Sequence, residues 1–130
     1  MIERFGSGPL ADEIKRMNVP LVSAVKANGF VFVSGMPAFD QNANKLCMGT
    51  IEEQTRVCMD NLKRALEDAG SSLDKIVKCT VMVPNPAHYD RINGVYGSYF
   101  KNGVYPARTF IAVAGWSVPF DVEIEAIALA

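Results

Sequence analysis

The spacing of apolar residues predicts two amphipathic helices. Within residues 51–69, apolar side chains recur every three or four positions, so they would form one face of a helix. Thr50 and Glu53 fit a capping box before this segment, and Gly70 follows it where helices commonly end. Pro86 suits the first turn of a second helix. The residues at helical spacing in this second segment are Tyr89, Ile92, Asn93, Tyr96, Tyr99 and Phe100.

Runs of β-branched and other apolar residues predict the strands. Val19–Ala27 and Phe30–Ser34 are joined through Asn28-Gly29, a dipeptide that favours the type I′ turn of a β-hairpin. Ile76–Val83 is rich in β-branched residues and predicts a central strand. Two further strands are predicted near the end of the chain, at Ala107–Ala114 and Val122–Leu129.

The remaining segments carry weaker signals. Residues 1–18 show no clear period and predict an N-terminal arm, in which Asp12–Met17 is compatible with a short helical turn. Pro37–Met48 predicts a loop, in which Lys45–Met48 is compatible with a brief strand pairing. Neither segment changes the predicted class of the domain.

The resulting order, β-β-(β)-α-β-α-β-β, predicts an α+β fold: one sheet with both helices packed on one face. We expect a single domain over residues 1–130. The strands are apolar on both faces, as Phe30 and Phe32 against Val31 and Val33 illustrate. A sheet covered on one side only would leave its other apolar face in water, so we expect partner subunits to cover it.

Composition narrows the class of protein. Apolar residues make up 49% of the chain and charged residues 21%, which is typical of a globular domain. A net charge of −1 without a basic run gives no footprint for nucleic acid, so nucleic-acid binding is not expected. No apolar stretch is long enough to span a membrane and no signal peptide is recognisable, so a cytoplasmic protein is expected.

The inventory of reactive side chains excludes several kinds of site. Cys47, Cys58 and Cys79 fit neither a metal knuckle nor a disulfide framework, and we expect them to be reduced thiols. His88 is the single histidine, which rules out a histidine-rich metal site. These residues therefore predict no metal site, and no organic cofactor is expected.

Three charged residues stand on the two apolar strands nearest the C-terminus. Glu123 and Glu125 share one face of their strand, because side chains alternate, and an ionised carboxylate there must be solvated, paired or used. Arg108 presents a planar fork that fits a carboxylate. It predicts either an anion clamp or a structural ion pair with Glu123 or Glu125, and the two glutamates are equally compatible with pairing between subunits.

Several segments keep the order and approximate spacing of a known family. They are Val33-Ser34-Gly35-Met36-Pro37, Gly49 to Thr55, Asn61 to Gly70, Asn93-Gly94-Val95-Tyr96, Pro106 to Phe110 and Val122 to Ala128. From about Pro20 to the C-terminus the chain resembles the Rid family of reactive intermediate deaminases, also called YjgF or L-PSP proteins.

The resemblance implies a fold, an assembly and a reaction. Members are chorismate-mutase-like homotrimers whose sheets form a central barrel, with three clefts between subunits. The implied reaction converts small enamine or imine acids, such as 2-aminoacrylate and 2-iminopropanoate, to a keto acid and ammonia. By resemblance Arg108 would hold the substrate carboxylate, and Glu123 would orient water and relay a proton. The further substrate-binding residues implied are Ser34, Gly35, Asn93 and Thr109, whereas Glu125 is expected to be structural.

The chain also departs from the family pattern. Leu21 stands where the family commonly has a cleft tyrosine, and Thr109 is assigned to the position of a cysteine that the family commonly carries two residues after the arginine. Trp116 occupies a loop near the expected cleft rim, where it could enlarge the pocket. Three alternatives therefore stay open: a deaminase of larger unsaturated amino acids such as 2-aminomuconate, a non-catalytic protein that binds small carboxylates, and an L-PSP-type endoribonuclease or translation inhibitor.

Overall fold

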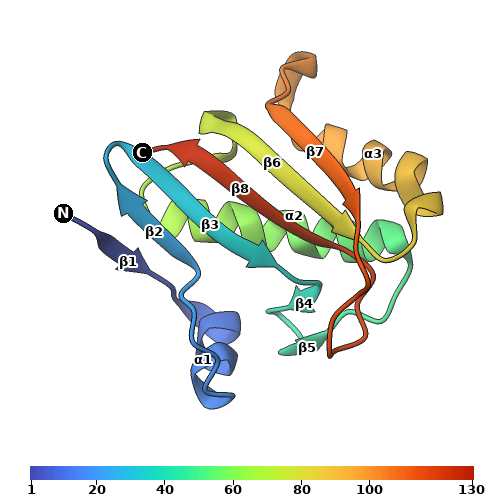
Figure 1. Cartoon of the computed structure of the whole chain (residues 1–130), viewed down its shortest axis with the longest axis horizontal. Helices are drawn as coiled ribbons and strands as arrows, with labels where there is room; N and C mark the ends of the chain where they lie inside the picture. The colour runs from blue at the N-terminus through green and yellow to red at the C-terminus, as the bar shows by residue number, and fades with distance from the viewer.

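A computed structural model describes residues 1–130, in which two helices pack on one face of a six-stranded sheet (Figure 1). In spatial order the strands of the sheet are β1 (Glu3–Phe5), β2 (Ala24–Ala27), β3 (Phe30–Met36), β8 (Glu123–Leu129), β6 (Ile76–Val83) and β7 (Ala107–Ala112). Neighbouring strands are antiparallel except β6 and β7, which are parallel. The predicted α+β class and single main sheet are confirmed.

The helices and smaller elements complete the fold. They are α1 (Gly8–Arg16), α2 (Ile51–Asp68), α3 (Tyr89–Ser98), the two-stranded hairpin of β4 (Phe39–Asp40) and β5 (Lys45–Leu46), and the 3-10 turns η1 (Leu73–Lys75), η2 (Pro86–His88) and η3 (Lys101–Gly103). Helices α2 and α3 lie behind the sheet in Figure 1, while α1 lies beyond the start of β2. The pairing of β4 with β5 confirms that the loop before α2 forms a brief strand.

Local signals placed α2 and the first hairpin correctly. Thr50 caps α2, because its hydroxyl oxygen accepts a hydrogen bond from the Glu53 N–H at 3.1 Å. Gly70, just beyond the helix, has a φ of +80°, which glycine adopts without strain. Asn28 and Gly29, with φ of 50° and 81°, form the turn between β2 and β3.

The N-terminal region differs from its sequence-based prediction. Residues 3–5 form β1, which pairs with β2 and extends the sheet, and α1 begins at Gly8 instead of near Asp12. Proline in the first turn of α1 explains the early start, since its fixed φ suits that position. Leu10 is buried in the core and Ile14 packs against it, so the helix is amphipathic.

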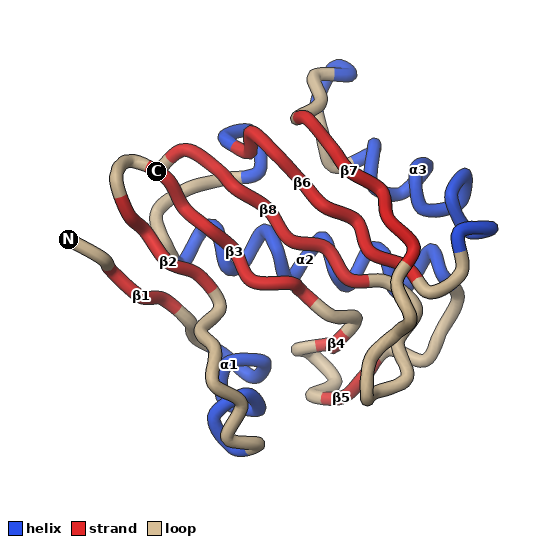
Figure 2. The backbone as a smooth tube through the Cα atoms, viewed as in Figure 1, coloured by secondary structure: helices blue, strands red, loops and turns tan.

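The sheet has one buried face and one open face. Strand β8 alternates strictly: Ile124, Ala126 and Ala128 are buried beneath the helices, whereas Glu125 and Leu129 are exposed. Figure 2 shows the helices gathered on one side of the strands. The opposite face carries large apolar side chains that remain exposed in a single chain, among them Phe32, Ile111 and Leu129.

Candidate active site

Arg108 lies on β7 and faces α3, where its guanidinium is surrounded by aromatic rings. The guanidinium carbon lies 4.9 Å from the ring centre of Tyr96 and 5.6 Å from the centres of Tyr89 and Phe110. Its Nη1 donates a hydrogen bond to Oδ1 of Asn93 at 2.8 Å. The rings and the amide hold the cation through cation–π and hydrogen-bond interactions, and they leave other N–H groups for an anion.

No carboxylate of the same chain pairs with Arg108. The ion pairs within the chain join Arg16 to Glu13 and Arg91 to Glu52. The alternative in which Arg108 pairs structurally with Glu123 or Glu125 is therefore wrong for the isolated chain. A partly buried guanidinium without a carboxylate partner is the arrangement that an anion-binding site requires.

Glu123 lies at the start of β8, close against the backbone of Gly35. A methyl group placed on Gly35 would approach the carboxyl carbon of Glu123 to 2.7 Å, so only glycine leaves room for this side chain. The pairing of β3 with β8 shifts between Val33 and Met36, which oppose Ala126 and Ile124. This β-bulge at Ser34-Gly35 positions the glycine beside the carboxyl group.

The environment of Glu123 favours its protonated form. Burial raises the pKa of its carboxyl above the ordinary value, and the charge of Glu125 adds to the rise. Hydrogen bonding from the Trp116 side chain partly opposes the rise. A glutamate with a raised pKa is suited to taking up and releasing protons near neutral pH.

Arg108 and Glu123 project from opposite faces of the sheet. Arg108 is paired with Cys79, and Cys79 with Ala126; both partners are buried on the helix-covered face. Glu123 is three residues from Ala126 along β8, so it lies on the open face. One chain therefore presents its cation and its acid to different sides.

Two other residues predicted to bind substrate, Ser34 and Thr109, make different contacts in the structure. Ser34 donates its hydroxyl hydrogen to the Val22 carbonyl at 2.6 Å and its backbone N–H to the Ser23 carbonyl at 2.9 Å. These bonds leave Ser34 no free donor for a ligand. Thr109 lies beside Thr80 on the open face, away from Arg108.

The assignment of Thr109 to the cysteine position was also wrong. The side chain that shares the face of Arg108 on β7 is Phe110, two positions along the strand. Phe110 packs edge-on against Tyr89, with ring centres 4.8 Å apart. At this position the chain thus has an aromatic wall in place of a thiol.

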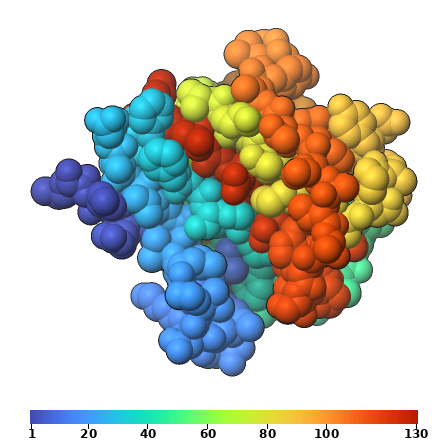
Figure 3. Space-filling model, viewed as in Figure 1, coloured from blue at the N-terminus to red at the C-terminus, as the bar shows by residue number.

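A groove of about 610 Å³ opens beside Glu123, and Trp116, which was expected near a cleft rim, lines it. It lies between α1, the β4–β5 hairpin and the loop from β7 to β8, and Figure 3 shows the hollow between the blue N-terminal region and the red-orange loop. Trp116 forms part of its wall and stacks on buried Phe120, with ring centres 4.4 Å apart. The helical spacing of Leu10 and Ile14 was the sequence pattern from which α1 could have been predicted.

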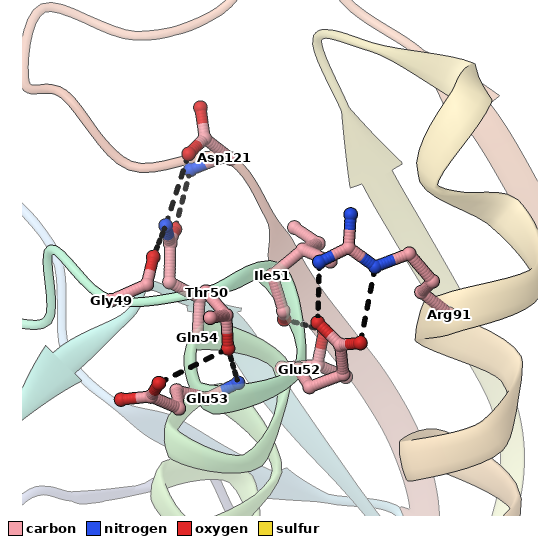
Figure 4. Close-up of polar contacts among 9 residues, drawn as sticks. Gly49, Thr50, Ile51, Glu52, Glu53, Gln54, Arg91 and Asp121 are labelled. Atoms are coloured by element: carbon pink, nitrogen blue, oxygen red, sulfur yellow. Dashed lines mark hydrogen bonds and ion pairs between the residues drawn. The ribbon is translucent and has the colours of Figure 1, made fainter.

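Hydrogen bonds of the buried Gln54 side chain fix the loop that carries Trp116. Gln54, at the start of α2, donates to Gly49 and to the Asp121 carboxylate at 3.0 Å, and accepts from the Asp121 N–H at 2.8 Å (Figure 4). The same view shows Arg91 of α3 paired with Glu52 of α2. These contacts tie both the loop and α3 to α2, so the rigid helix positions both halves of the site.

The structure offers neither a metal-binding cluster nor a membrane-spanning helix. No three side chains among His, Cys, Asp and Glu gather closely enough to hold a metal ion. None of the helices has both the length and the apolar character needed to cross a membrane.

Comparison with known proteins places this geometry in a family. Residues 13–130 match the family model "Endoribonuclease L-PSP". Among curated relatives, a RutC family protein of Pyrococcus abyssi is 37% identical over 84% of this chain and 85% of its own length. The chloroplastic Reactive Intermediate Deaminase A of Arabidopsis thaliana is 32% identical over 84% of this chain and 58% of its own length.

Solved structures agree. Yeast Mmf1 superposes with a TM-score of 0.86 at 31% identity, covering 99% of this chain and 98% of that one. Escherichia coli TdcF with bound serine gives 0.79 at 30% identity, covering 85% and 88%. The resemblance found in the sequence is thus confirmed, and the chain belongs to the L-PSP family, which includes the Rid and YjgF proteins.

Proposed function

We propose that this protein hydrolyses small enamine and imine acids to keto acids and ammonia. The observation that carries the proposal is the Arg108 guanidinium, which is held by Asn93 and three aromatic rings and has no carboxylate partner in the chain. A site of this kind fits the carboxylate that every α-imino acid carries. A relative named Reactive Intermediate Deaminase A and a neighbour with bound serine support the same class of ligand.

The placement of the two charged groups supports an assembly of more than one chain. Because Arg108 and Glu123 face opposite sides of one sheet, a single small molecule meets both only if they come from different subunits. The exposed apolar face with Phe32 and Leu129 supplies the surface for such an association. We propose a homotrimer whose open sheet faces form a central barrel, with each cleft between two subunits.

In this cleft, positioning and acid–base chemistry would suffice for the reaction. Arg108 of one subunit holds the substrate carboxylate, and Glu123 of the next lies beside the imine carbon. Ionised Glu123 accepts a proton from water as the oxygen bonds to the carbon of the protonated imine and the C=N π electrons move to nitrogen, which gives a neutral carbinolamine. It then returns this proton to the nitrogen. As the C–N bond breaks, the hydroxyl passes its proton to the departing ammonia, and the keto acid and ammonium leave. An enamine first takes up a proton at its β-carbon to become the imine.

The test measures release of ammonia and keto acid from 2-aminoacrylate that is generated in situ. We expect the protein to accelerate release over the uncatalysed rate, and Arg108→Ala to lose about 10²-fold of this acceleration. Arg56→Ala, which removes an exposed arginine of α2, is the matched control and should behave as wild type. An unaccelerated reaction would overturn the proposal.

The family name also raises RNA cleavage as a candidate activity. A net charge of −1 gives the chain no general attraction for a phosphate backbone. Purified protein should therefore leave a single-stranded RNA intact under the conditions of the deaminase assay. Cleavage by wild type that disappears in an Arg108→Ala, Glu123→Ala double variant would instead make the same site a nuclease.

A further inference from the structure

We infer that the preferred substrates carry an apolar side chain, which lies in the groove between α1 and the β7–β8 loop. This inference rests on the proposed function and adds the substrate class. Glu123 and Gly35 line one part of the groove, so a ligand whose reacting carbon lies at Glu123 directs its side chain along the rest. The groove volume of about 610 Å³ is ample for an aliphatic or aromatic side chain.

The lining of the groove defines the chemistry of that side chain. Its walls away from Glu123 are mainly apolar and include Leu10, Ile14, Met17, Leu21, Trp116 and Val118. Arg16, which also borders the groove, is already bonded to Glu13 through two of its nitrogens. Lys45 also borders the groove, but it is exposed to water on the β4–β5 hairpin. A second carboxylate on the substrate would therefore meet mainly apolar surface inside the groove, so a neutral hydrocarbon side chain fits better than a dicarboxylate.

Trp116 forms the rigid wall of the groove. Its ring stacks on Phe120 at an interplanar angle of 25°, and Phe120 is buried in the core. The loop beyond it is held by the hydrogen bonds of Asp121 with Gln54. Trp116 and Glu123 line the same groove, so the apolar wall continues to the reacting group. We assign Trp116 as a specificity-determining residue.

The catalytic test compares imines that differ only in their side chains. An amino acid oxidase, with catalase present, generates them from alanine, leucine and glutamate, and semicarbazide traps the imine that the protein does not hydrolyse. We expect the leucine imine to be hydrolysed at least about 10-fold more efficiently than those of alanine and glutamate. Trp116→Ala should abolish the preference for leucine, so that the leucine imine is hydrolysed no more than about twofold better than the alanine imine by the same variant. Equal rates for the imines, or a preference for glutamate, would overturn the inference while the proposed function stood.

A matched pair of methionine variants guards against a folding defect in Trp116→Ala. Met17 lines the groove and is 53% exposed, whereas Met48 lies outside it and is 66% exposed. Met17→Gln should reduce hydrolysis of the leucine imine about threefold or more, because a polar group replaces apolar contact area. Met48→Gln should change neither rate. Equal effects of the two substitutions would contradict a role for the groove.

A binding measurement separates this inference from the proposed reaction. Trp116 is the only tryptophan of the chain, so its fluorescence reports directly on the groove. Titration with 4-methyl-2-oxopentanoate should change the emission at a concentration at least about 10-fold lower than titration with pyruvate. This result would support the groove even if no imine were hydrolysed. An identical response to both keto acids would overturn it.

Discussion

Arg108 and Glu123 lie on opposite faces of the same sheet, with β6 between their strands. Arg108 faces α3 beside Asn93, and Glu123 lies on the open face beside Gly35. If both groups act on one substrate, each active site must combine two chains. Subunit mixing therefore tests the proposed function and the proposed assembly together.

Mixed oligomers of two inactive variants should recover activity. Arg108→Ala and Glu123→Ala are each expected to be inactive alone, but in trimers that contain both chains roughly one third of the clefts receive an intact arginine and an intact glutamate. Co-expressed chains with different affinity tags, purified through both tags, would be assayed for imine hydrolysis. Activity near zero in the mixture would mean that both residues must come from one chain.

Gly35→Ala should separate activity from folding. The added methyl group would overlap the Glu123 carboxyl, but that side chain can rotate away, so the carboxyl moves while the fold remains. We expect imine hydrolysis to fall about 10- to 100-fold. The midpoint of urea unfolding should change little.

Gly94→Ala is the matched control for this substitution. Gly94 lies within α3, and a methyl group there would meet no atom within 4 Å. This variant should keep full activity and gain about 0.5–1 kcal/mol of stability, because alanine favours the helix. Equal activity of the two alanine variants would show that the position of Glu123 beside Gly35 is unimportant.

The raised pKa of Glu123 predicts how stability depends on pH. Burial raises this pKa in the folded chain. At pH values between the pKa in the unfolded chain and the pKa in the folded chain, the native state therefore binds the proton more strongly. Stability should therefore fall as the pH rises through this window. Glu123→Gln removes the titration and should be more stable than wild type at pH 7, with the difference vanishing below about pH 4.

Denaturant unfolding of both proteins at equal concentration measures this effect. Equal concentration matters because assembly itself stabilises the folded chain. Glu125→Gln, on the same face of β8 but exposed, controls for loss of a carboxylate. A Glu123→Gln variant that is less stable than wild type at pH 7 would show that a cation, such as Arg108 of a neighbouring subunit, pairs with the ionised group.

Short-range signals explain why much of the fold could be predicted. The Thr50 cap, the Asn28-Gly29 turn and the alternation along β8 are all set by residues close in sequence. The N-terminal region was not predicted, because three residues of β1 gain their order only by pairing with β2. Tertiary pairing of this kind leaves little trace in local sequence.

The candidate site was only partly predictable for the same reason. Arg108 and Glu123 could be selected from the C-terminal strands, but their opposite orientations depend on the register of β7, β6 and β8. The aromatic surroundings of Arg108 join residues from α3 and β7, up to 21 positions apart. Such a contact requires the folded crossover between β6 and β7.

Tyr89 lies beside Arg108, and the role of its hydroxyl can be tested directly. Its hydroxyl oxygen lies 3.5 Å from Nη2 of Arg108, and its ring is held edge-on against Phe110. Leu21 lacks the hydroxyl that the family commonly places in the cleft, so Tyr89 offers one from another element. We predict that this hydroxyl helps to hold the guanidinium and the substrate carboxylate.

Tyr89→Phe keeps the ring and removes only this hydroxyl. We expect KM for the imine to rise about 3- to 10-fold while kcat changes less than about twofold, because the lost contact serves binding in both ground and transition states. Tyr89→Leu should raise KM further, since it also removes the cation–π contact. Tyr105→Phe, which removes the hydroxyl of another exposed tyrosine, should leave both constants unchanged. An unaltered KM in Tyr89→Phe, combined with a rise in Tyr89→Leu, would assign the role to the ring alone.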